Sequence, residues 1–93
     1  MIEDFKCKET KNIWEGKKSR KFPSKIQNRA LCKLRLLDAS ARLEDLRMPP
    51  SNHLEALKGK RKGRHSIRIN RQWRICFKWK QNGSFEVEIV DYH

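Results

Sequence analysis

The spacing of apolar residues follows a helical period in the first half of the chain and an alternating period in the second. Between residues 24 and 41 the apolar positions recur at steps of three and four, as on one face of a helix. They are Ile26, Ala30, Leu34, Leu37 and Ala41. The pattern predicts a helix that opens at Phe22-Pro23-Ser24, with Ser24 as its N-cap, and that weakens around residues 38–40.

Shorter patterns flank this helix. Residues 9–15 have a helical composition that stops at Gly16, a typical residue after a helix end. Residues 2–5 mix apolar and polar side chains, which indicates a short edge or central strand. Residues 43–46 indicate a further helical turn before the Pro49-Pro50 pair, which cannot continue a helix.

From Ser66 onward apolar and polar residues alternate, which is the period of a half-buried strand. A turn at residues 70–72 and the hairpin dipeptide Asn82-Gly83 divide the alternating stretch into three runs. The apolar positions are Ile67 and Ile69, then Trp73, Ile75, Phe77 and Trp79, then Phe85, Val87 and Ile89. We therefore predict one domain, residues 1–93, of the α+β class, with N-terminal helices packed on a small antiparallel-rich sheet of three strands.

Strand alternation also assigns side chains to the two faces of the predicted sheet. If the apolar side chains of residues 73–79 point into the core, Arg74 points to the other side. The same count puts Arg68 and Tyr92 on that exposed face. It puts Asp91 and His93 on the core side, although a chain end can swing round the sheet edge.

The exposed face predicted in this way carries two guanidinium groups and is bordered by a basic loop at residues 58–64. Such a face can seat RNA phosphates. The alternative is structural, because an arginine on the wet face of a strand pairs readily with an acid such as Glu86 or Glu88 across the hairpin. His53 and His65 fall in predicted loops and have no partner at a catalytic spacing.

Charge narrows the class of partner. The chain has 23 Lys and Arg against 11 Asp and Glu, for a formal net charge of +12. Residues 16–30 and 58–80 contain no acid at all. A field of this sign and size draws a protein to polyanions. Nucleic acid is the leading candidate, and an anionic membrane surface or a masking acidic protein are the others.

The three cysteines argue against a metal centre. Cys7, Cys32 and Cys76 are odd in number and far apart, and no zinc-ligand spacing is present. An odd count with no secretory signal pattern indicates reduced thiols and hence a cytoplasmic protein. No apolar run approaches the roughly 20 residues that span a bilayer. We expect no metal, no other cofactor and no membrane association.

Two stretches carry a resemblance to a known family. They are NHLEALKGKRKGRHSIRINRQWRICFKW, residues 52–79, and VEIVDYH, residues 87–93, and LRMPPSN at residues 46–52 extends the similarity. The sequence resembles the HigB-type toxins of the RelE/ParE superfamily of bacterial type II toxin–antitoxin systems, also called plasmid maintenance killer proteins. The resemblance implies a RelE-like microbial ribonuclease-type fold, in agreement with the α+β prediction.

The resemblance also implies an activity and partners. Members of the family are endoribonucleases that enter the A site of the bacterial ribosome and cut the mRNA codon there, which stops translation. Each is held inactive by a HigA-type antitoxin with a helix-turn-helix. Operator DNA is bound only through the toxin–antitoxin complex, which represses its own operon.

The family's site residues map onto positions of this chain. The residues that match its catalytic set are Lys58, Arg74, Asp91, Tyr92 and His93. The basic residues around them that we expect to bind RNA are His53, Lys60, Arg61, Lys62, Arg64, His65 and Arg68. One departure is Glu55, which stands where some members have a histidine, so His53 or His65 substitutes or the task is shared differently.

These residue types suit metal-free cleavage by the ribose 2′-OH. Arg74 can bind two phosphate oxygens and stabilise the transition-state charge, with Lys58 adding to it. His93 has a reference pKa of about 6.5 and can serve as base or acid. Asp91 can orient it or act as the base, and Tyr92 can stack on a base or bond the phosphate. The order of these roles stays open.

Two other functions compete with this one. A ParE-type toxin would trap DNA gyrase with no nuclease chemistry, and it would have little use for a terminal Asp-Tyr-His. A non-enzymatic basic RNA-binding module would bind ribosomes with a steep salt dependence and leave mRNA intact.

Overall fold

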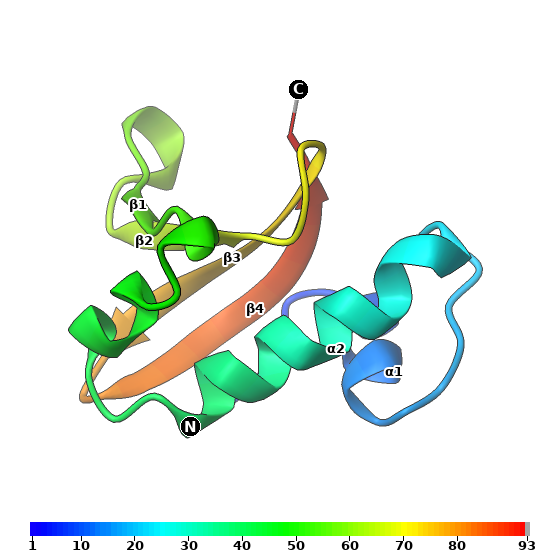
Figure 1. Cartoon of the computed structure of the whole chain (residues 1–93). Helices are drawn as coiled ribbons and strands as arrows, with labels where there is room; N and C mark the ends of the chain where they lie inside the picture. The colour runs from blue at the N-terminus through cyan, green and yellow to red at the C-terminus, as the bar shows by residue number, and fades with distance from the viewer. Residues whose placement is uncertain (93) are drawn as a thin grey trace.

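The computed structural model describes residues 1–92 and confirms the α+β prediction. Two α-helices and three short 3-10 helices accompany a four-stranded sheet (Figure 1). The elements in chain order are α1 (Lys8–Trp14), α2 (Ser24–Ala39), η1 (Leu43–Arg47), η2 (Pro50–Asn52), β1 (Glu55–Ala56), η3 (Gly59–Arg61), β2 (Arg64–Arg68), β3 (Trp73–Lys80) and β4 (Gly83–Asp91). No helix within residues 1–92 is long and apolar enough to cross a membrane.

Helix α2 lies where the apolar period places it, with small differences at its ends. Ile26, Ala30, Leu34 and Leu37 are buried and face the core. Ala41 is exposed, because Ser40 has extended backbone and ends the helix after Ala39. Ser24 is the first helical residue and makes no capping bond, so its prediction as N-cap is wrong.

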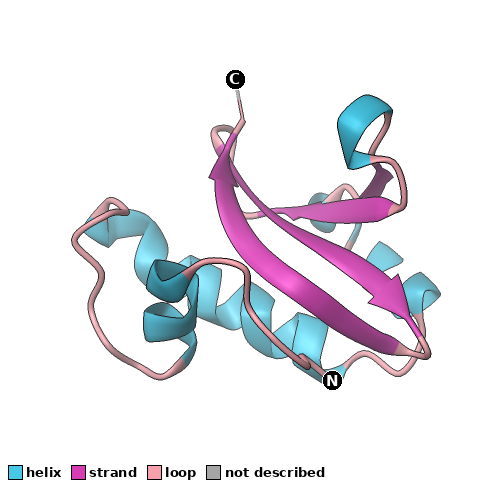
Figure 2. Cartoon of the chain, turned by 180° about the vertical axis from the view of Figure 1, so that it is seen from behind, coloured by secondary structure: helices cyan, strands magenta, loops and turns pink. Residues whose placement is uncertain are grey.

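The sheet is antiparallel in the order β1-β2-β3-β4, and helices α1 and α2 lie together on one side of it (Figure 1, Figure 2). Strand β1 is additional to the three predicted strands; at two residues it is too short to show a period. Ile2 and Phe5 form single parallel bridges to Ser84 and Val87, so the N-terminal segment lies along β4 without forming a strand of its own.

A bulge in β4 reverses the predicted orientation of the Phe85 side chain. Glu86 has φ 52, and the register shifts between Cys76 and Lys78 on the neighbouring strand. Phe85 therefore pairs with Lys78 on the face away from the helices, while Val87 and the residues after it keep the core side. The prediction that Phe85 points into the core is wrong, because the extra residue flips the alternation on one side of the bulge.

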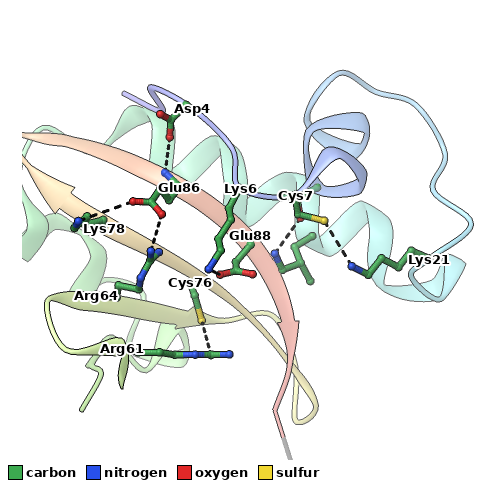
Figure 3. A network of polar contacts seen from close by, with 12 residues as sticks. Asp4, Lys6, Cys7, Lys21, Arg61, Arg64, Cys76, Lys78, Glu86 and Glu88 are labelled. Carbon is green, nitrogen blue, oxygen red and sulfur yellow. Dashed lines mark hydrogen bonds and ion pairs between the residues drawn. The ribbon is translucent and has the colours of Figure 1, made fainter. Parts of the chain in front are cut away.

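The sheet face opposite the helices is more covered than the alternation predicts. Arg74 is only 7% exposed and Cys76 is fully buried. The His53 carbonyl, from the loop ahead of β1, accepts a bond from Arg74. The Arg61 side chain of η3 also covers this face, with Nη1 3.8 Å from Cys76 Sγ (Figure 3). The prediction of an exposed Arg74 is corrected accordingly: its side chain is on the expected face but beneath a loop.

Candidate active site

The Arg74 guanidinium is the centre of the candidate site and is held firmly on β3. Its Nε donates to the Ser66 hydroxyl at 2.8 Å, and its Nη2 donates to the Ser66 carbonyl at 3.3 Å. Nη2 also donates to the His53 carbonyl. A buried charge is costly without such partners, so these bonds both compensate the guanidinium and fix its orientation.

Strand pairing and a local turn supply these anchors. Arg68 pairs with Arg74 in the β2–β3 register, and Ser66 lies two residues away on the same face, within reach of the Arg74 side chain. His53 follows η2 in a left-handed conformation, with φ 44 and ψ 57, and from there its carbonyl reaches Arg74. A left-handed histidine is uncommon, and such conformations concentrate at functional sites.

The remaining edge of the guanidinium faces two further side chains. Arg74 Nη1 lies 4.0 Å from a carboxylate oxygen of Glu55. The Tyr92 ring centre lies 5.6 Å from Arg74 Cζ, within the range of a cation–π contact. Arg74 is therefore flanked by an acid from β1 and a phenol from the chain end, which are groups able to act on a substrate held by the guanidinium.

These residues line a hollow of about 360 Å³. Its lining residues are His53, Glu55, Arg68, Asn70, Arg71, Arg74 and Tyr92. Three arginines against one carboxylate make its lining positive. An anion such as a phosphodiester suits this charge.

The turn between β2 and β3 closes one side of the hollow. Asn70 Oδ1 accepts bonds from the backbone N–H groups of Gln72 and Trp73, both at 2.9 Å, which is the side-chain pattern of an Asx turn. The Arg68 Nε donates to the Asn70 carbonyl at 3.1 Å. The Tyr92 N–H donates to the Gln72 carbonyl at 2.5 Å, so the same turn fixes Tyr92.

The predicted catalytic residues are partly brought together. Arg74 and Tyr92 share the hollow. Asp91 pairs with Trp73 on the other sheet face, is exposed, and accepts a bond from Gln72 Nε2 at 3.1 Å. Lys58 is exposed ahead of η3 and does not line the hollow. His93 lies outside the described residues.

The predicted RNA-binding residues divide in the same way. His53 and Arg68 line the hollow. Three others are exposed on or next to η3: Lys60, Arg61 and Lys62. Arg64 belongs to β2, where its Nη2 lies 2.7 Å from Glu86 Oε1, and this contact lowers the pKa of the Glu86 carboxyl (Figure 3).

His65 is misplaced by the sequence prediction. It lies within β2, not in a loop, and pairs with Phe77 on the core side. Its ring stacks on Phe77 with centroids 6.3 Å apart, and burial lowers the pKa of its imidazole. Because alternation points it away from Arg74, the hollow does not include it.

Three residues of the hollow were absent from the sequence prediction: Glu55, as a neighbour of Arg74, and Asn70 and Arg71 of the turn. Arg71 could have been found, because it is a basic residue three positions before Arg74, in the turn that joins β2 to β3. The family resemblance had marked Glu55 only as a departure at the position of a histidine, and its place beside Arg74 could not be predicted, because strand β1 is too short to show a pattern. Within the described residues no group of three or more His, Cys, Asp or Glu is placed to hold a metal ion.

Comparison of the fold with solved structures finds bacterial proteins. YafQ from Escherichia coli superposes with a TM-score of 0.63 at 11% identity, over 98% of this chain and 93% of that one. YoeB in the YoeB–YefM complex from Staphylococcus aureus superposes with a TM-score of 0.62 at 16% identity, over 100% of this chain and 98% of that one. At these identities the likeness shows a shared fold.

Sequence comparison is more specific. Toxin HigB-1 of Vibrio cholerae serotype O1 is 44% identical over 80 residues, which are 85% of this chain and 84% of that protein. Endoribonuclease HigB of Proteus vulgaris is 29% identical over 93 residues, the full length of both. A family model described as the RelE-like toxin of type II toxin–antitoxin system HigB matches residues 3–93. The chain therefore belongs to the HigB-like toxins, the RelE-like members of type II toxin–antitoxin systems, whose partner is an antitoxin.

Proposed function

We propose that this toxin is an endoribonuclease that cuts mRNA in the A site of the ribosome and thereby inhibits translation. One observation carries the proposal: Arg74 is locked by Ser66 and His53 with its remaining edge in a positively charged hollow. A guanidinium fixed in advance of binding is suited to a charge that develops in a transition state, because it needs no reorganisation.

The reaction that fits this site is an internal transesterification. The ribose 2′-OH loses its proton to a base and attacks the phosphorus. The bond from phosphorus to the 5′ oxygen breaks, and an acid protonates that oxygen. The products are a 2′,3′-cyclic phosphate and a 5′-OH. Arg74 binds the non-bridging oxygens, whose negative charge increases in the transition state.

Other side chains are proposed to supply the remaining roles. Tyr92, whose ring centre lies 5.6 Å from Arg74 Cζ, would contact a base or the phosphate. His93 stays the predicted acid or base, and Asp91 and Lys58 stay predicted accessories. Alignment of the substrate by the ribosome would contribute orientation, which can lower a barrier by roughly 7–11 kcal/mol. Such help would let a site whose described lining holds one histidine, His53, cleave RNA.

A similar protein and the net charge support the proposed activity and the proposed partners. The protein of Proteus vulgaris carries the name endoribonuclease and aligns over the whole chain. The net charge of +12 suits association with ribosomal RNA, and the toxin is proposed to act in the cytoplasm. The antitoxin is proposed to be of the HigA type, and operator DNA is contacted through their complex.

Arg74→Lys tests the proposal, because lysine keeps the charge but loses the fork and its anchors. Purified toxin is added to translating ribosomes, and mRNA ends are mapped by primer extension. We expect codon-spaced cuts with the wild type, and a cleavage rate about 100-fold lower in the variant, the usual cost of removing one transition-state donor. Arg35→Lys, on the exposed face of α2, is the matched control and should cut normally.

Three results would contradict the proposal, which combines nuclease activity with a role for Arg74 in the chemistry. Cuts that persist unchanged in Arg74→Lys would remove Arg74 from the chemistry. Inhibited supercoiling by DNA gyrase, with intact mRNA, would identify a gyrase inhibitor. Ribosome binding without cuts from the wild type would identify a non-enzymatic RNA-binding module.

A further inference from the structure

A second hollow lies beside the Arg74 site, between α2 and the turn that follows β2. Its volume is about 450 Å³. Four cationic side chains line it: Arg29 and Lys33 from α2, Arg68 from β2 and Arg71 from the turn. None of its nine lining residues is acidic. We call it the α2 groove.

Among residues 1–92, no acidic side chain forms an ion pair with the four cations of the α2 groove. The ion pairs found among residues 1–92 join other side chains, such as Arg64 with Glu86 and Lys6 with Glu88. Arg68 Nε is bonded to a carbonyl, and Lys33 Nζ donates to the amide oxygen of Asn52. Both partners are uncharged. Four like charges around one hollow repel one another, and an anion bound among them would relieve this.

Lys33 lies close enough to Arg29 for the two positive charges to interact. Burial, and next the positive charge of Arg29, lower the pKa of its ammonium. The Asn52 side chain that accepts its bond is fully buried and also donates to the carbonyls of Leu46 and Met48, at 3.1 and 3.2 Å. Lys33 is thus held at the groove by a fixed, buried partner, and its place does not depend on a flexible surface contact.

The α2 groove is continuous with the Arg74 hollow. Four residues line both: His53, Arg68, Asn70 and Arg71. A phosphodiester chain with its scissile linkage at Arg74 can therefore continue across Arg68 and Arg71 to Arg29 and Lys33 without leaving a basic surface. We propose that the α2 groove binds the sugar-phosphate backbone of the RNA strand on one side of the scissile linkage. This inference rests on the proposed nuclease function.

An acidic protein segment is the other polyanion that such a groove could accept, and the lining argues against it. A docked amphipathic helix needs an apolar floor for its anchor residues. The aliphatic side chain in the lining is Ile69, which is 3% exposed and belongs to the core. Arginines and polar side chains without apolar anchors are typical of backbone contacts to nucleic acid.

The test uses the full-length protein and a single-stranded RNA oligonucleotide that is 2′-O-methylated throughout, so that it binds without being cut. Fluorescence anisotropy gives the dissociation constant at several salt concentrations. Arg29→Gln/Lys33→Gln should weaken binding several-fold and reduce the slope of log affinity against log salt by about 1.4, since each phosphate contact on a single strand contributes about 0.7.

Lys25→Gln/Arg35→Gln is the control, because it removes the same charge from exposed positions on the same helix outside the groove. The slope of log affinity against log salt for this control should equal that of the wild type. Equal losses in both double variants would overturn the proposal, because net charge alone would then explain binding. Should Lys33 prove necessary for folding, Arg29→Gln alone, with Arg35→Gln beside it, should reduce the slope by about 0.7.

Two further outcomes separate RNA binding by the groove from protein docking there and from the nuclease chemistry. Unchanged RNA binding with lost antitoxin binding in Arg29→Gln/Lys33→Gln would make the groove a protein-docking surface and overturn the inference. Because the oligonucleotide is not cut, its binding does not report on the nuclease chemistry. The absence of codon-spaced cuts by the wild-type toxin would therefore contradict the nuclease, while the slope of log affinity against log salt would still test the groove.

Discussion

At the scale of single residues, the site depends on polar side chains that the fold buries. Arg74 is useful because Ser66 and the His53 carbonyl hold it, and Ser66 itself is fully buried. A surface arginine samples many rotamers and must lose that freedom when it binds. The buried arrangement meets this cost during folding, so the guanidinium is already oriented when a phosphate arrives.

His65 makes a prediction about pH. Burial holds the pKa of its imidazole below the ordinary value of about 6.5, so the unfolded chain binds more protons than the folded one as the pH falls through that range. Its contribution to stability is therefore complete above pH 6.5 and is lost as the medium becomes more acidic. Urea midpoints of the wild type should fall between pH 7.5 and 5.5, and those of His65→Phe, which keeps the ring stack on Phe77, should fall less. Equal falls would contradict the assignment.

At the scale of elements, short irregular segments position the site more than the long ones do. Strand β1 and helix η2 contain only two and three residues, yet β1 supplies Glu55 and the residue that follows η2 supplies the His53 carbonyl. Between η1 and η2 the chain is held by Asn52, whose amide donates to the Leu46 and Met48 carbonyls and accepts from Lys33. The Asn52 amide thus links helix α2 to the segment between η1 and η2, directly before His53, whose carbonyl binds Arg74.

Asn52→Ala should therefore affect both stability and cleavage. The substitution leaves buried carbonyls without their donor, at a cost of about 1–3 kcal/mol in the free energy of unfolding. Because His53 follows directly, the loosened loop should also lower the mRNA cleavage rate. Chemical denaturation and primer extension measure the two effects. Asn28→Ala removes the same side chain from the exposed face of α2 and should lower neither; a stable, active Asn52→Ala would contradict the role of the loop.

At the scale of the whole molecule, charge and shape act together. A net charge of +12 on 93 residues attracts polyanions from any direction, while the joined hollows present Arg29, Lys33, Arg68, Arg71 and Arg74 along one path. The long-range field accelerates encounter, and the local arrangement selects where the strand lies. Helices α1 and α2 lie on one side of the sheet (Figure 2), and α2 brings Arg29 and Lys33 to the path beside the turn that follows β2.

RNA affinity should accordingly fall steeply with salt. Raising monovalent salt from 50 to 200 mM should weaken binding of the uncleavable oligonucleotide by about tenfold or more, the effect of releasing counterions from about three phosphates. Anisotropy titrations measure the change. A nonionic solute at matched osmolality is the control and should leave the affinity unchanged. An affinity independent of salt would contradict a backbone-binding mode.

Much of the fold was predictable because local rules decide it. The three-and-four spacing of Ile26, Ala30, Leu34 and Leu37 suffices to place α2, and Asn82-Gly83 suffices to place the last hairpin. The site was less predictable. The orientation of Phe85 is set by the bulge at Glu86, whose N–H donates to Asp4 of the N-terminal segment, a contact between residues far apart in the chain.

By itself, the sequence determined the class of the fold, the order of its long elements, the excess positive charge and the strand position of Arg74. Periodicity and composition are local or additive properties, so they can be read along the chain. Only the tertiary structure decided that Arg74 is buried, that Glu55 lies beside it, that His65 points away, and that α2 extends the basic surface with Arg29 and Lys33. Those outcomes depend on contacts between segments far apart in the chain, and their geometry is set by packing.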